Sequence, residues 1–499
     1  MKTNGLMETK KVPTYYNLVN GERKPSSTGQ TFRISNPADK REILGEFQQS
    51  NAADAAEEID FAQAAQKDWE RVPPPKRGEI LYKAAQIIET DAEDFARTLT
   101  REEGKTLPES RLEVYRAVDT LRYFAGDGRR LNGEVVASDD PDVLLYTVRT
   151  PLGVVSIITP WNFPIAEPAW KISPALLCGN AVVFKPASLT PLIGWMFTEA
   201  LIKAGVPPGV LNFITGPGST VGIELVRNKK VAAISFTGSY DVGVTIQKAM
   251  SEDGRMPRIQ LEMGGKNPLV VLADADLDKA SEIAAKGAFG VTGQACTATS
   301  RIIVEEIVAD RFTQMLVKRA ESIRVGDGSS ADSDMGPAVS ESELAKDLNY
   351  VAIGKEEGAH LLCGGTRLED PPHKHGFFIR PAVFSEVKPG MRIAQEEIFG
   401  PVVAVLRARD FNQAVELAND TEYGLSSAIC TRSLEKANEF VRKINAGLVK
   451  VNRTTTGVSV QAPFGGMKHS SSMTFKELGR SALDFYSYTK TVYMGIRPP

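Results

Sequence analysis

The chain has 499 residues, too many for one hydrophobic core, and this length suits two or three domains. Its 42% apolar and 24% charged residues are ordinary for globular proteins and exclude general disorder and fibrous repeats. The formal net charge of −3 argues against a nucleic-acid-binding protein, which would carry a basic excess.

Neither a membrane span nor a metal site is predicted. No run of about 18 apolar residues occurs, and residues 1–11 lack the apolar core of a signal peptide. The four cysteines lie far apart without a CxxC spacing, which favours neither a disulfide framework nor a zinc ribbon. We therefore expect a cytoplasmic protein that binds no metal, no membrane and no nucleic acid.

The first part of the chain predicts short strands, then helices, then an extended arm. Residues 14–36 form short strands around Asn20-Gly21, a strong hairpin signal. Apolar residues at helical spacing from Ile80 to Leu99 predict one helix, and a second is predicted at residues 110–125. Residues 134–146 are polar and β-like, as expected of an arm, and the strand-like tail at residues 484–494 is its candidate partner.

Two series of strands and helices follow. Each apolar run precedes a turn and a helical pattern, at residues 154–159, 181–184, 210–215 and 231–236, and then at 268–272, 301–305, 402–406, 427–430 and 447–452. Strand–turn–helix repeats at this spacing are typical of parallel βαβ units. The sequence therefore predicts an α/β fold with two doubly wound domains and a cleft between them.

Two glycine-rich turns are candidates for a nucleotide site. They lie at residues 216–222 and 237–243, each after a predicted strand, where glycines and a helix N-terminus allow a phosphate to approach. Neither turn is a true GxGxxG, and each alone is equally well a tight βα turn. Because the two turns follow successive strands and open onto one edge of the sheet, they together favour a nucleotide-binding site. Lys185 ends another strand at the same edge.

Three polar residues suggest chemistry. Cys296 lies among Gly, Gln, Thr and Ser, so it is as readily a reactive thiol as a structural one. Glu262 enters a Gly-Gly turn, where a surface acid is the simpler interpretation. Asn162 closes the first strand of the βα series, and its amide can donate a hydrogen bond to an oxyanion.

The chain resembles the NAD(P)-dependent aldehyde dehydrogenase superfamily over residues 14–494. Seven motifs occur in the family's order: PWNFP at 160–164, KP at 185–186, FTGS at 236–239, LEMGGK at 261–266, GQAC at 293–296, EIFGP at 397–401 and PFGG at 463–466. The resemblance implies a Rossmann-like cofactor domain at residues 14–131 and 152–262 and a catalytic domain at 263–471. It also implies an oligomerisation arm at 132–151 and 480–499, in a homodimer or homotetramer.

The resemblance also implies a mechanism. Cys296 attacks the aldehyde as a thiolate, and the Asn162 amide and the Cys296 N–H hold the oxyanion. Hydride transfer leaves a thioester, which water activated by Glu262 hydrolyses. Lys171 matches a family lysine that supports proton transfer, although a structural role fits almost as well. CoA-acylating relatives usually lack the acid at the Glu262 position, and an inactive structural relative would be expected to lose Cys296, Glu262 or Asn162.

The implied cofactor is NADP or NAD. Glu397 resembles the family's nicotinamide-ribose anchor, and the other implied contacts are Thr159, Pro160, Trp161, Lys185, Ser188, Gly218, Gly222, Phe236, Thr237, Gly238, Ser239 and Phe399. NAD-preferring relatives carry an acid at the Ser188 position, which would repel a 2′-phosphate. Because serine stands there and Lys185 can attract the phosphate, we expect NADP to be preferred.

The implied substrate tunnel is lined by Phe163, Glu167, Trp170, Ala295, Thr297, Arg453, Val458 and Phe464. The segments 294–301 and 466–472 are most similar to the 2-oxoglutarate semialdehyde (2,5-dioxopentanoate) dehydrogenases. Arg453 is the candidate partner for that substrate's carboxylate, whereas Glu167 would oppose it. A broad-specificity aliphatic or aromatic aldehyde dehydrogenase and a succinate-semialdehyde dehydrogenase therefore remain as alternatives.

Overall fold

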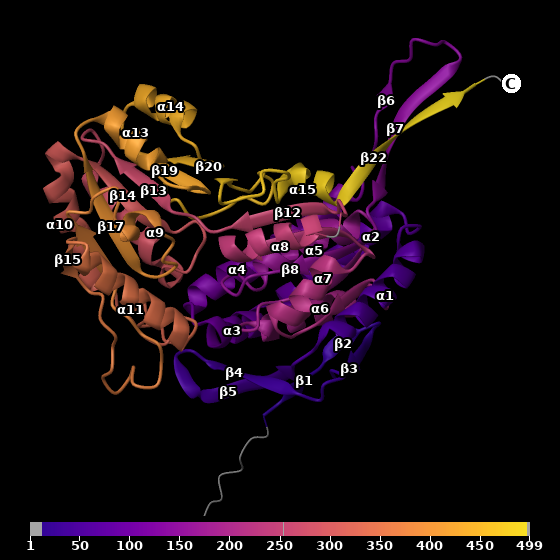
Figure 1. The fold of residues 1–499 in the computed structure, drawn as a ribbon, viewed down its shortest axis with the longest axis horizontal. Helices are drawn as coiled ribbons and strands as arrows, with labels where there is room; N and C mark the ends of the chain where they lie inside the picture. The colour runs from indigo at the N-terminus through magenta and orange to yellow at the C-terminus, as the bar shows by residue number, and fades with distance from the viewer. Residues whose placement is uncertain (1–11, 253, 497–499) are drawn as a thin grey trace, which may run out of the picture.

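The computed structural model describes residues 12–252 and 254–496. The segment considered for a signal peptide (1–11) and the last three residues of the predicted arm (497–499) lie outside the described residues. The described chain forms two lobes, each built around a sheet, and a strand arm that projects from the first lobe (Figure 1).

The first lobe contains a seven-stranded sheet in the order β12-β11-β8-β9-β10-β2-β3. Its strands are β12 (Arg258–Met263), β11 (Val231–Gly238), β8 (Val154–Ile158), β9 (Ala181–Lys185), β10 (Leu211–Phe213), β2 (Asn17–Val19) and β3 (Glu22–Lys24). The first five strands pair in parallel, and the β2–β3 hairpin adds an antiparallel edge. The hairpin turns at Asn20 and Gly21, both with positive φ, as the sequence predicts.

Helices cover both faces of this sheet because its strands are apolar on both sides. Along β8 and β9, Val155, Ile157, Val182 and Phe184 face one core and Val154, Ala181 and Val183 face another. The first core is closed by α2 (Pro74–Thr90), α3 (Ala92–Glu103), α4 (Leu107–Asp127), α5 (Ala166–Leu177), α6 (Pro191–Ala204) and α15 (Gly479–Tyr486). The second is closed by α1 (Ala52–Trp69), α7 (Ile223–Arg227) and α8 (Tyr240–Glu252).

The second lobe repeats this plan around a sheet in the order β15-β16-β17-β14-β13-β19-β20. Its strands are β15 (His360–Cys363), β16 (Ala382–Ser385), β17 (Val402–Ala408), β14 (Thr299–Glu305), β13 (Asn267–Val271), β19 (Ser426–Cys430) and β20 (Leu448–Val451). All pairs are parallel except β15–β16. The sheet lies between α9 (Leu277–Phe289) and α10 (Glu306–Ser322) on one face and α11 (Glu341–Glu356), α12 (Arg392–Gln395), α13 (Phe411–Asn419) and α14 (Leu434–Lys443) on the other.

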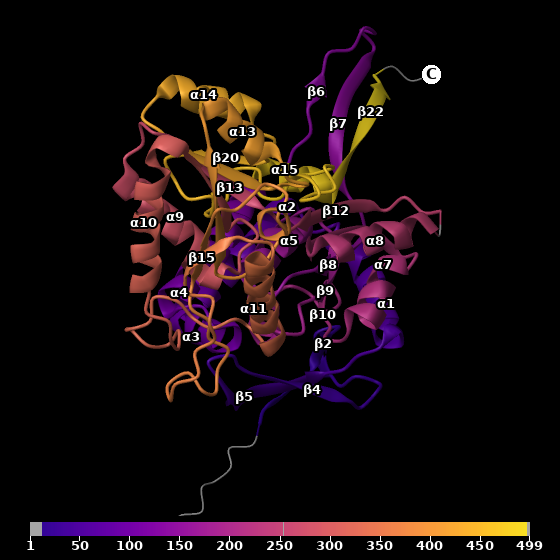
Figure 2. The ribbon, with the colours of Figure 1, turned by 60° about the vertical axis from the view of Figure 1, so that its left-hand side comes forward.

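The arm consists of β6 (Val135–Val136), β7 (Val143–Pro151) and β22 (Ser487–Gly495). β22 pairs antiparallel with β7 along its whole length, from Ser487 opposite Pro151 to Gly495 opposite Val143. It extends away from the body of the molecule in both views (Figures 1 and 2). Smaller pieces are β1 (Thr14–Tyr15), β4 (Thr31–Asn36) and β5 (Asp39–Gln48) at the base of the first lobe, and β18 (Tyr423–Gly424) paired with β21 (Met467–Lys468).

Two boundaries differ from the predicted ones. The helix predicted across Ile80–Leu99 is broken at Asp91 (φ −100°, ψ 19°) into α2 and α3. Aspartate disfavours a helix interior because its carboxylate competes for backbone N–H groups. Both helices bury apolar faces in the same core, so the spacing of apolar residues alone does not show the break. The predicted tail strand also begins late, because residues 484–486 complete α15, whose Phe485 and Tyr486 are buried.

Within the described residues, no helix is both long and apolar enough to cross a membrane.

Candidate active site

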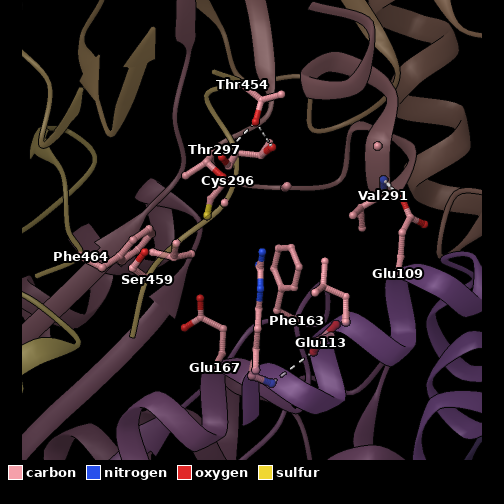
Figure 3. Close-up of a pocket in the computed structure, with 18 of the residues that line it drawn as sticks. Glu109, Glu113, Phe163, Glu167, Val291, Cys296, Thr297, Thr454, Ser459 and Phe464 are labelled. Atoms are coloured by element: carbon pink, nitrogen blue, oxygen red, sulfur yellow. Dashed lines mark hydrogen bonds between the residues drawn. The ribbon is translucent and has the colours of Figure 1, made fainter. Parts of the chain in front are cut away.

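A cavity of about 660 Å³ lies beside Cys296, between α4 and α5 of the first lobe and the 290–297 and 450–464 segments of the second. All eight residues predicted to line a substrate tunnel lie on its wall: Phe163, Glu167, Trp170, Ala295, Thr297, Arg453, Val458 and Phe464. Figure 3 shows Cys296 on one wall and Glu167 and Phe163 on the wall that faces it. Glu167 and Arg453 therefore both face the cavity.

The loop that carries Cys296 has a constrained backbone. Val291 and Thr292 have φ of 53° and 56°, in the left-handed region that β-branched residues avoid. Three contacts hold the loop: Val291 N–H donates to Glu109 Oε1 (2.7 Å), Thr292 Oγ1 donates to Gly336 O (3.1 Å), and Val339 N–H donates to Gln294 Oε1 (2.9 Å). Such strain persists only where surrounding contacts determine the conformation.

Asn267, at the start of β13, fixes the backbone of Cys296 itself. Its Nδ2 donates to Cys296 O (2.8 Å) and to Ala298 O (2.9 Å), while its Oδ1 accepts from Ser426 N–H (2.9 Å). Both ends of the amide are thus engaged. This residue stands in the LEMGGKN segment next to the recognised motif, but a spacing pattern gives no sign that its side chain reaches across to Cys296.

The environment of Cys296 disfavours the thiolate form of its side chain. Burial raises its pKa well above the ordinary value, and the carboxylates of Glu167, Glu397, Glu262 and Glu477 raise it further. Charged carboxylates near the sulfur oppose the thiolate with which the predicted mechanism begins, and that step stays a prediction. Nucleophilic attack therefore requires that a neighbouring group take the thiol proton.

Asn162 contacts the loop that carries Cys296: its Nδ2 donates to the backbone carbonyl of Gln294 (3.0 Å), two residues before Cys296. The backbone carbonyl of Asn162 accepts a hydrogen bond from Lys105 Nζ (2.5 Å), which also donates to Glu113 Oε2 (2.6 Å). Glu113 Oε1 in turn accepts from the N–H groups of Ile165 (3.1 Å) and Ala166 (3.2 Å) at the start of α5. The buried Lys105–Glu113 pair therefore holds the turn between β8 and α5 that presents Asn162.

Glu262 lies near the end of β12 and is held away from the cavity wall. Gly466 N–H donates to its Oε2 (3.0 Å) and Ser471 Oγ donates to its Oε1 (3.1 Å). A Cβ on Gly465 would overlap the Glu262 carboxylate, so the glycines of the PFGG motif make room for this acid. Burial, and then the nearby Glu477, raise the pKa of Glu262 well above its usual value.

Lys171 belongs to a buried polar cluster behind the cavity. Its Nζ contacts a carboxylate oxygen of Glu477 and donates to Ser235 Oγ (3.1 Å). Glu167, one turn earlier on α5, is buried, and its Oε2 accepts no hydrogen bond from the described residues. Burial and Glu477 raise the pKa of Glu167, so its carboxyl group is protonated near neutral pH.

The predicted cofactor residues of the first lobe gather at one edge of its sheet. Ile158 of β8 pairs with Lys185 of β9 and with Phe236 of β11, so these parallel strands end at the same level. The remaining predicted contacts lie at the ends of these strands, as Thr237 and Gly238 do in β11, or in the segments that follow strands: Thr159, Pro160 and Trp161; Ser188; Gly218 and Gly222; and Ser239. This edge is where doubly wound sheets bind nucleotides.

The second lobe contributes Glu397 and Phe399 to the same region. Glu397 Oε1 accepts from Gly265 N–H (2.8 Å), and a Cβ on Gly264 would overlap its carboxylate. The Phe399 ring packs edge-on against Trp161 at 5.3 Å between centroids. Burial raises the pKa of Glu397 to about 7.

The residues at this edge fit a dinucleotide. Among the residues that the structure describes, the buried Lys185 amine has one hydrogen-bond partner, Pro186 O (3.0 Å), and no counter-ion; burial lowers the pKa of Lys185 to about 8. The buried Thr159 Oγ1 has no partner among the described residues. The space beside Gly218 and Gly222 is open, so a phosphate can approach their backbone. A buried cation without a counter-ion and an orphaned hydroxyl are groups that a bound phosphate and ribose would satisfy.

Sequence reasoning missed the part of the cavity wall that α4 supplies. Glu109, Leu112, Glu113 and Arg116 all line the cavity, together with Lys105 just before the helix. Their spacing of three and four residues places them on one helix face, which is the available signal. Read alone, however, such a face looks like an ordinary solvated surface.

Comparisons with known proteins agree with this geometry. A model of the aldehyde dehydrogenase family matches residues 24–492. The α-ketoglutarate semialdehyde dehydrogenase of Haloferax volcanii is 48% identical over 477 residues, which cover 96% of this chain and 98% of the relative. The 2,5-dioxopentanoate dehydrogenase of Saccharolobus solfataricus is 46% identical over 94% of this chain and 97% of its own.

Solved structures share the fold. The betaine aldehyde dehydrogenase of Staphylococcus aureus in complex with NAD⁺ superposes with a TM-score of 0.94 at 35% identity, covering 97% of this chain and 96% of that one. A 3,6-anhydro-L-galactose dehydrogenase in complex with NADP gives 0.93 at 37% identity, covering 96% and 100%. The predicted α/β architecture with two sheets and an arm is confirmed. The chain belongs to the aldehyde dehydrogenase family and is an NAD(P)-dependent, aldehyde-oxidising enzyme.

Proposed function

We propose that the enzyme oxidises an anionic semialdehyde of the 2,5-dioxopentanoate type to the dicarboxylate, with NADP as the preferred hydride acceptor. The names of the relatives at 46% and 48% identity support this substrate. The observation that carries the proposal is the charge of the cavity wall, which suits an anion.

Five basic side chains line the cavity, against three acidic ones. The basic side chains are those of Lys105, Arg116, Lys286, Lys450 and Arg453, and the acidic ones are those of Glu109, Glu113 and Glu167. Glu113 is paired with Lys105, and Glu109 accepts from Val291 N–H and from Thr106. Since burial raises the pKa of Glu167 to about 8, its carboxyl group is neutral near pH 7 and does not repel a carboxylate. The remaining field is positive and favours an anionic substrate.

In the proposed chemistry, Cys296 Sγ attacks the aldehyde carbon and its proton passes to a neighbouring carboxylate. Asn162 Nδ2 and the Cys296 N–H stabilise the oxyanion of the adduct. The bound dinucleotide supplies the hydride acceptor, and the thioester then remains on Cys296. Glu262 leaves its position at Gly466 and Ser471 and takes a proton from the water that attacks the thioester carbon. The bond between that carbon and Cys296 Sγ then breaks, which releases the carboxylic acid and frees Cys296. Lys171, paired with Glu477, carries the released proton away from the site.

Ser188 and Lys185 support the preference for NADP. No acid stands at position 188, so nothing there repels a 2′-phosphate, and the buried Lys185 ammonium can attract it. Steady-state kcat/KM for NADP and NAD at saturating aldehyde tests this: a higher value for NADP is expected, and a tenfold preference for NAD contradicts the proposal.

We also propose the predicted division of the chain, with residues 14–131 and 152–262 binding the cofactor and 263–471 forming the catalytic domain. The predicted arm comprises residues 132–151 and 480–499, and its second part forms a strand at Ser487–Gly495. Exposed apolar side chains of the arm, among them Val135, Leu144 and Tyr493, support its role in a homodimer or homotetramer. Sedimentation of the whole enzyme and of a truncation before β22 tests this role. The cytoplasmic location stays a prediction.

A panel of aldehydes tests the substrate. Purified enzyme with NADP is expected to give a kcat/KM for 2,5-dioxopentanoate at least tenfold above that for pentanal, a neutral aldehyde of the same length. Succinate semialdehyde, which is one carbon shorter, is expected to fall between them. Equal values for the acid and the neutral aldehyde would contradict the proposal and favour a broad-specificity enzyme.

A further inference from the structure

Arg116 is a half-buried cation on the cavity wall, in the middle of α4. Among the described residues, none forms a hydrogen bond or an ion pair with its guanidinium. Other arginines in the interior are engaged: Arg77 donates to Leu177 O (2.7 Å) and Val72 O (2.6 Å), and Arg301 donates to Leu417 O (2.6 Å) and Asp420 O (3.0 Å). Arg116 therefore lacks the carbonyl partners that hold Arg77 and Arg301.

Within the described part of the chain, no acid forms an ion pair with Arg116, and one acid, Glu113, acts on its charge from a distance. Burial lowers its pKa, and only Glu113, one turn earlier on α4, acts in the opposite direction. The Glu113 carboxylate is already occupied by Lys105 and by two backbone N–H groups of α5. Removing a cation from water without a partner is costly, so this position is stabilised when an anion enters the cavity.

Lys450 and Arg453, which also line the cavity, differ from Arg116 in their free hydrogen-bond donors or in their exposure to solvent. Lys450 Nζ donates to three carbonyls, Thr455 O (2.8 Å), Thr456 O (2.5 Å) and Gly457 O (2.6 Å), so its donors are used. Its pKa is lowered to about 8 by burial and then by the charges of Arg116 and Arg453, so the three cations lie near one another. Arg453 is exposed. A half-buried, unoccupied planar fork matches the two oxygens of a carboxylate.

We propose that Arg116 binds the distal carboxylate of the substrate while the aldehyde carbon lies at Cys296, with Arg453 adding charge from the other wall. The inference rests on the proposed function and deepens it, because it names the residue that selects an anionic semialdehyde over a neutral aldehyde. Arg116 acts in substrate selection and takes no part in bond making.

The test compares R116Q with wild-type enzyme on two substrates, 2,5-dioxopentanoate and pentanal. R116Q is expected to lower the ratio of their kcat/KM values by about 10- to 100-fold, the effect of losing a hydrogen bond to a charged group. R116K keeps the charge without the fork and is expected to give an intermediate ratio. R111Q is the matched control, since Arg111 lies on the same helix but is exposed and paired with Glu93, and it is expected to leave the ratio unchanged.

A second readout does not depend on turnover of the semialdehyde. The dicarboxylate product, 2-oxoglutarate, is used as an inhibitor of pentanal oxidation, and its inhibition constant is expected to rise in R116Q and to stay unchanged in R111Q. If wild-type enzyme favours the semialdehyde and R116Q keeps that preference, the assignment of Arg116 is overturned while the proposed function stands. If wild-type enzyme shows no preference, the proposed function fails and the assignment fails with it.

Discussion

The Lys105–Glu113 pair links the stability of the first lobe to the position of Asn162. Both side chains are almost fully buried, at 1% and 2% exposure, with Lys105 Nζ 2.6 Å from Glu113 Oε2 and 2.5 Å from Asn162 O. The Lys105→Met variant keeps most of the side-chain volume and removes the ammonium group. It leaves a buried carboxylate without its cation, which typically costs about 3–5 kcal/mol. Because Glu113 keeps two N–H donors, we expect a loss of about 3 kcal/mol in the free energy of unfolding.

Urea unfolding and aldehyde turnover measure the two consequences. Asn162 loses the donor to its carbonyl, so kcat is expected to fall, by up to about 100-fold if the oxyanion donor is displaced. In the double variant K105M/E113Q the glutamine oxygen still accepts from Ile165 and Ala166 N–H without a buried charge, so about half of the lost stability should return. Lys76→Met serves as the control because the Lys76–Glu79 pair is exposed, and its removal should change stability by less than about 0.5 kcal/mol.

Two results would refute this reasoning. The first is a Lys105→Met enzyme as stable and as active as the wild type. The second is a double variant that loses the sum of the two single losses, since independent additivity would mean that the two side chains are not coupled.

Three further predictions follow from the site. Burial lowers the pKa of Lys185 to about 8, so its ammonium form is present below pH 8 and is lost above it. In fluorescence titrations, the Kd for NADP should be constant below pH 8 and rise by up to about tenfold per pH unit above it. An equal rise in the Kd for NAD would count against Lys185 as the contact of the 2′-phosphate. The Glu167→Gln variant resembles the protonated acid and should leave semialdehyde oxidation at neutral pH nearly unchanged. At alkaline pH, Glu167 of the wild type is ionised and opposes ionisation of Cys296, so the variant should be alkylated faster at Cys296. An unchanged alkylation rate would speak against this coupling. The Asn267→Ala variant leaves the carbonyls of Cys296 and Ala298 without their hydrogen-bond donor and should lower the free energy of unfolding by about 1–3 kcal/mol. It should also lower kcat with little change in the Kd for the cofactor. Normal turnover would show that Asn267 does not position the nucleophile.

The fold was accessible from the sequence because its strands are buried on both faces. Continuous apolar runs such as residues 181–184 and 268–272, bounded by turn residues, are typical of such strands, and each coincides with a strand of the two sheets to within one residue. The arm was also accessible, since residues 134–146 are polar and β-like between turns. The break at Asp91 was hidden, because α2 and α3 present apolar residues to the same core.

Only some of the residues that line the cavity could be predicted from the sequence. Motifs fix Cys296, Phe163 and Phe464 at defined places in the family's fold, so their meeting could be expected from the resemblance. Arg116 could not be found in this way, because a half-buried arginine and a solvated one look the same on a helix face. The raised pKa of the Cys296 thiol could not be predicted from the sequence either, because it depends on burial and on carboxylates that four separate segments bring together.

The covalent role of Cys296 and the hydrolytic role of Glu262 are tested together by the Glu262→Gln variant, mixed rapidly with NADP and aldehyde and examined by absorbance and peptide mass. We expect one burst of NADPH equal to the number of active sites, followed by a stall with the acyl group on the Cys296 peptide. Steady turnover at the wild-type rate, or an acyl group on any other residue, would contradict the account.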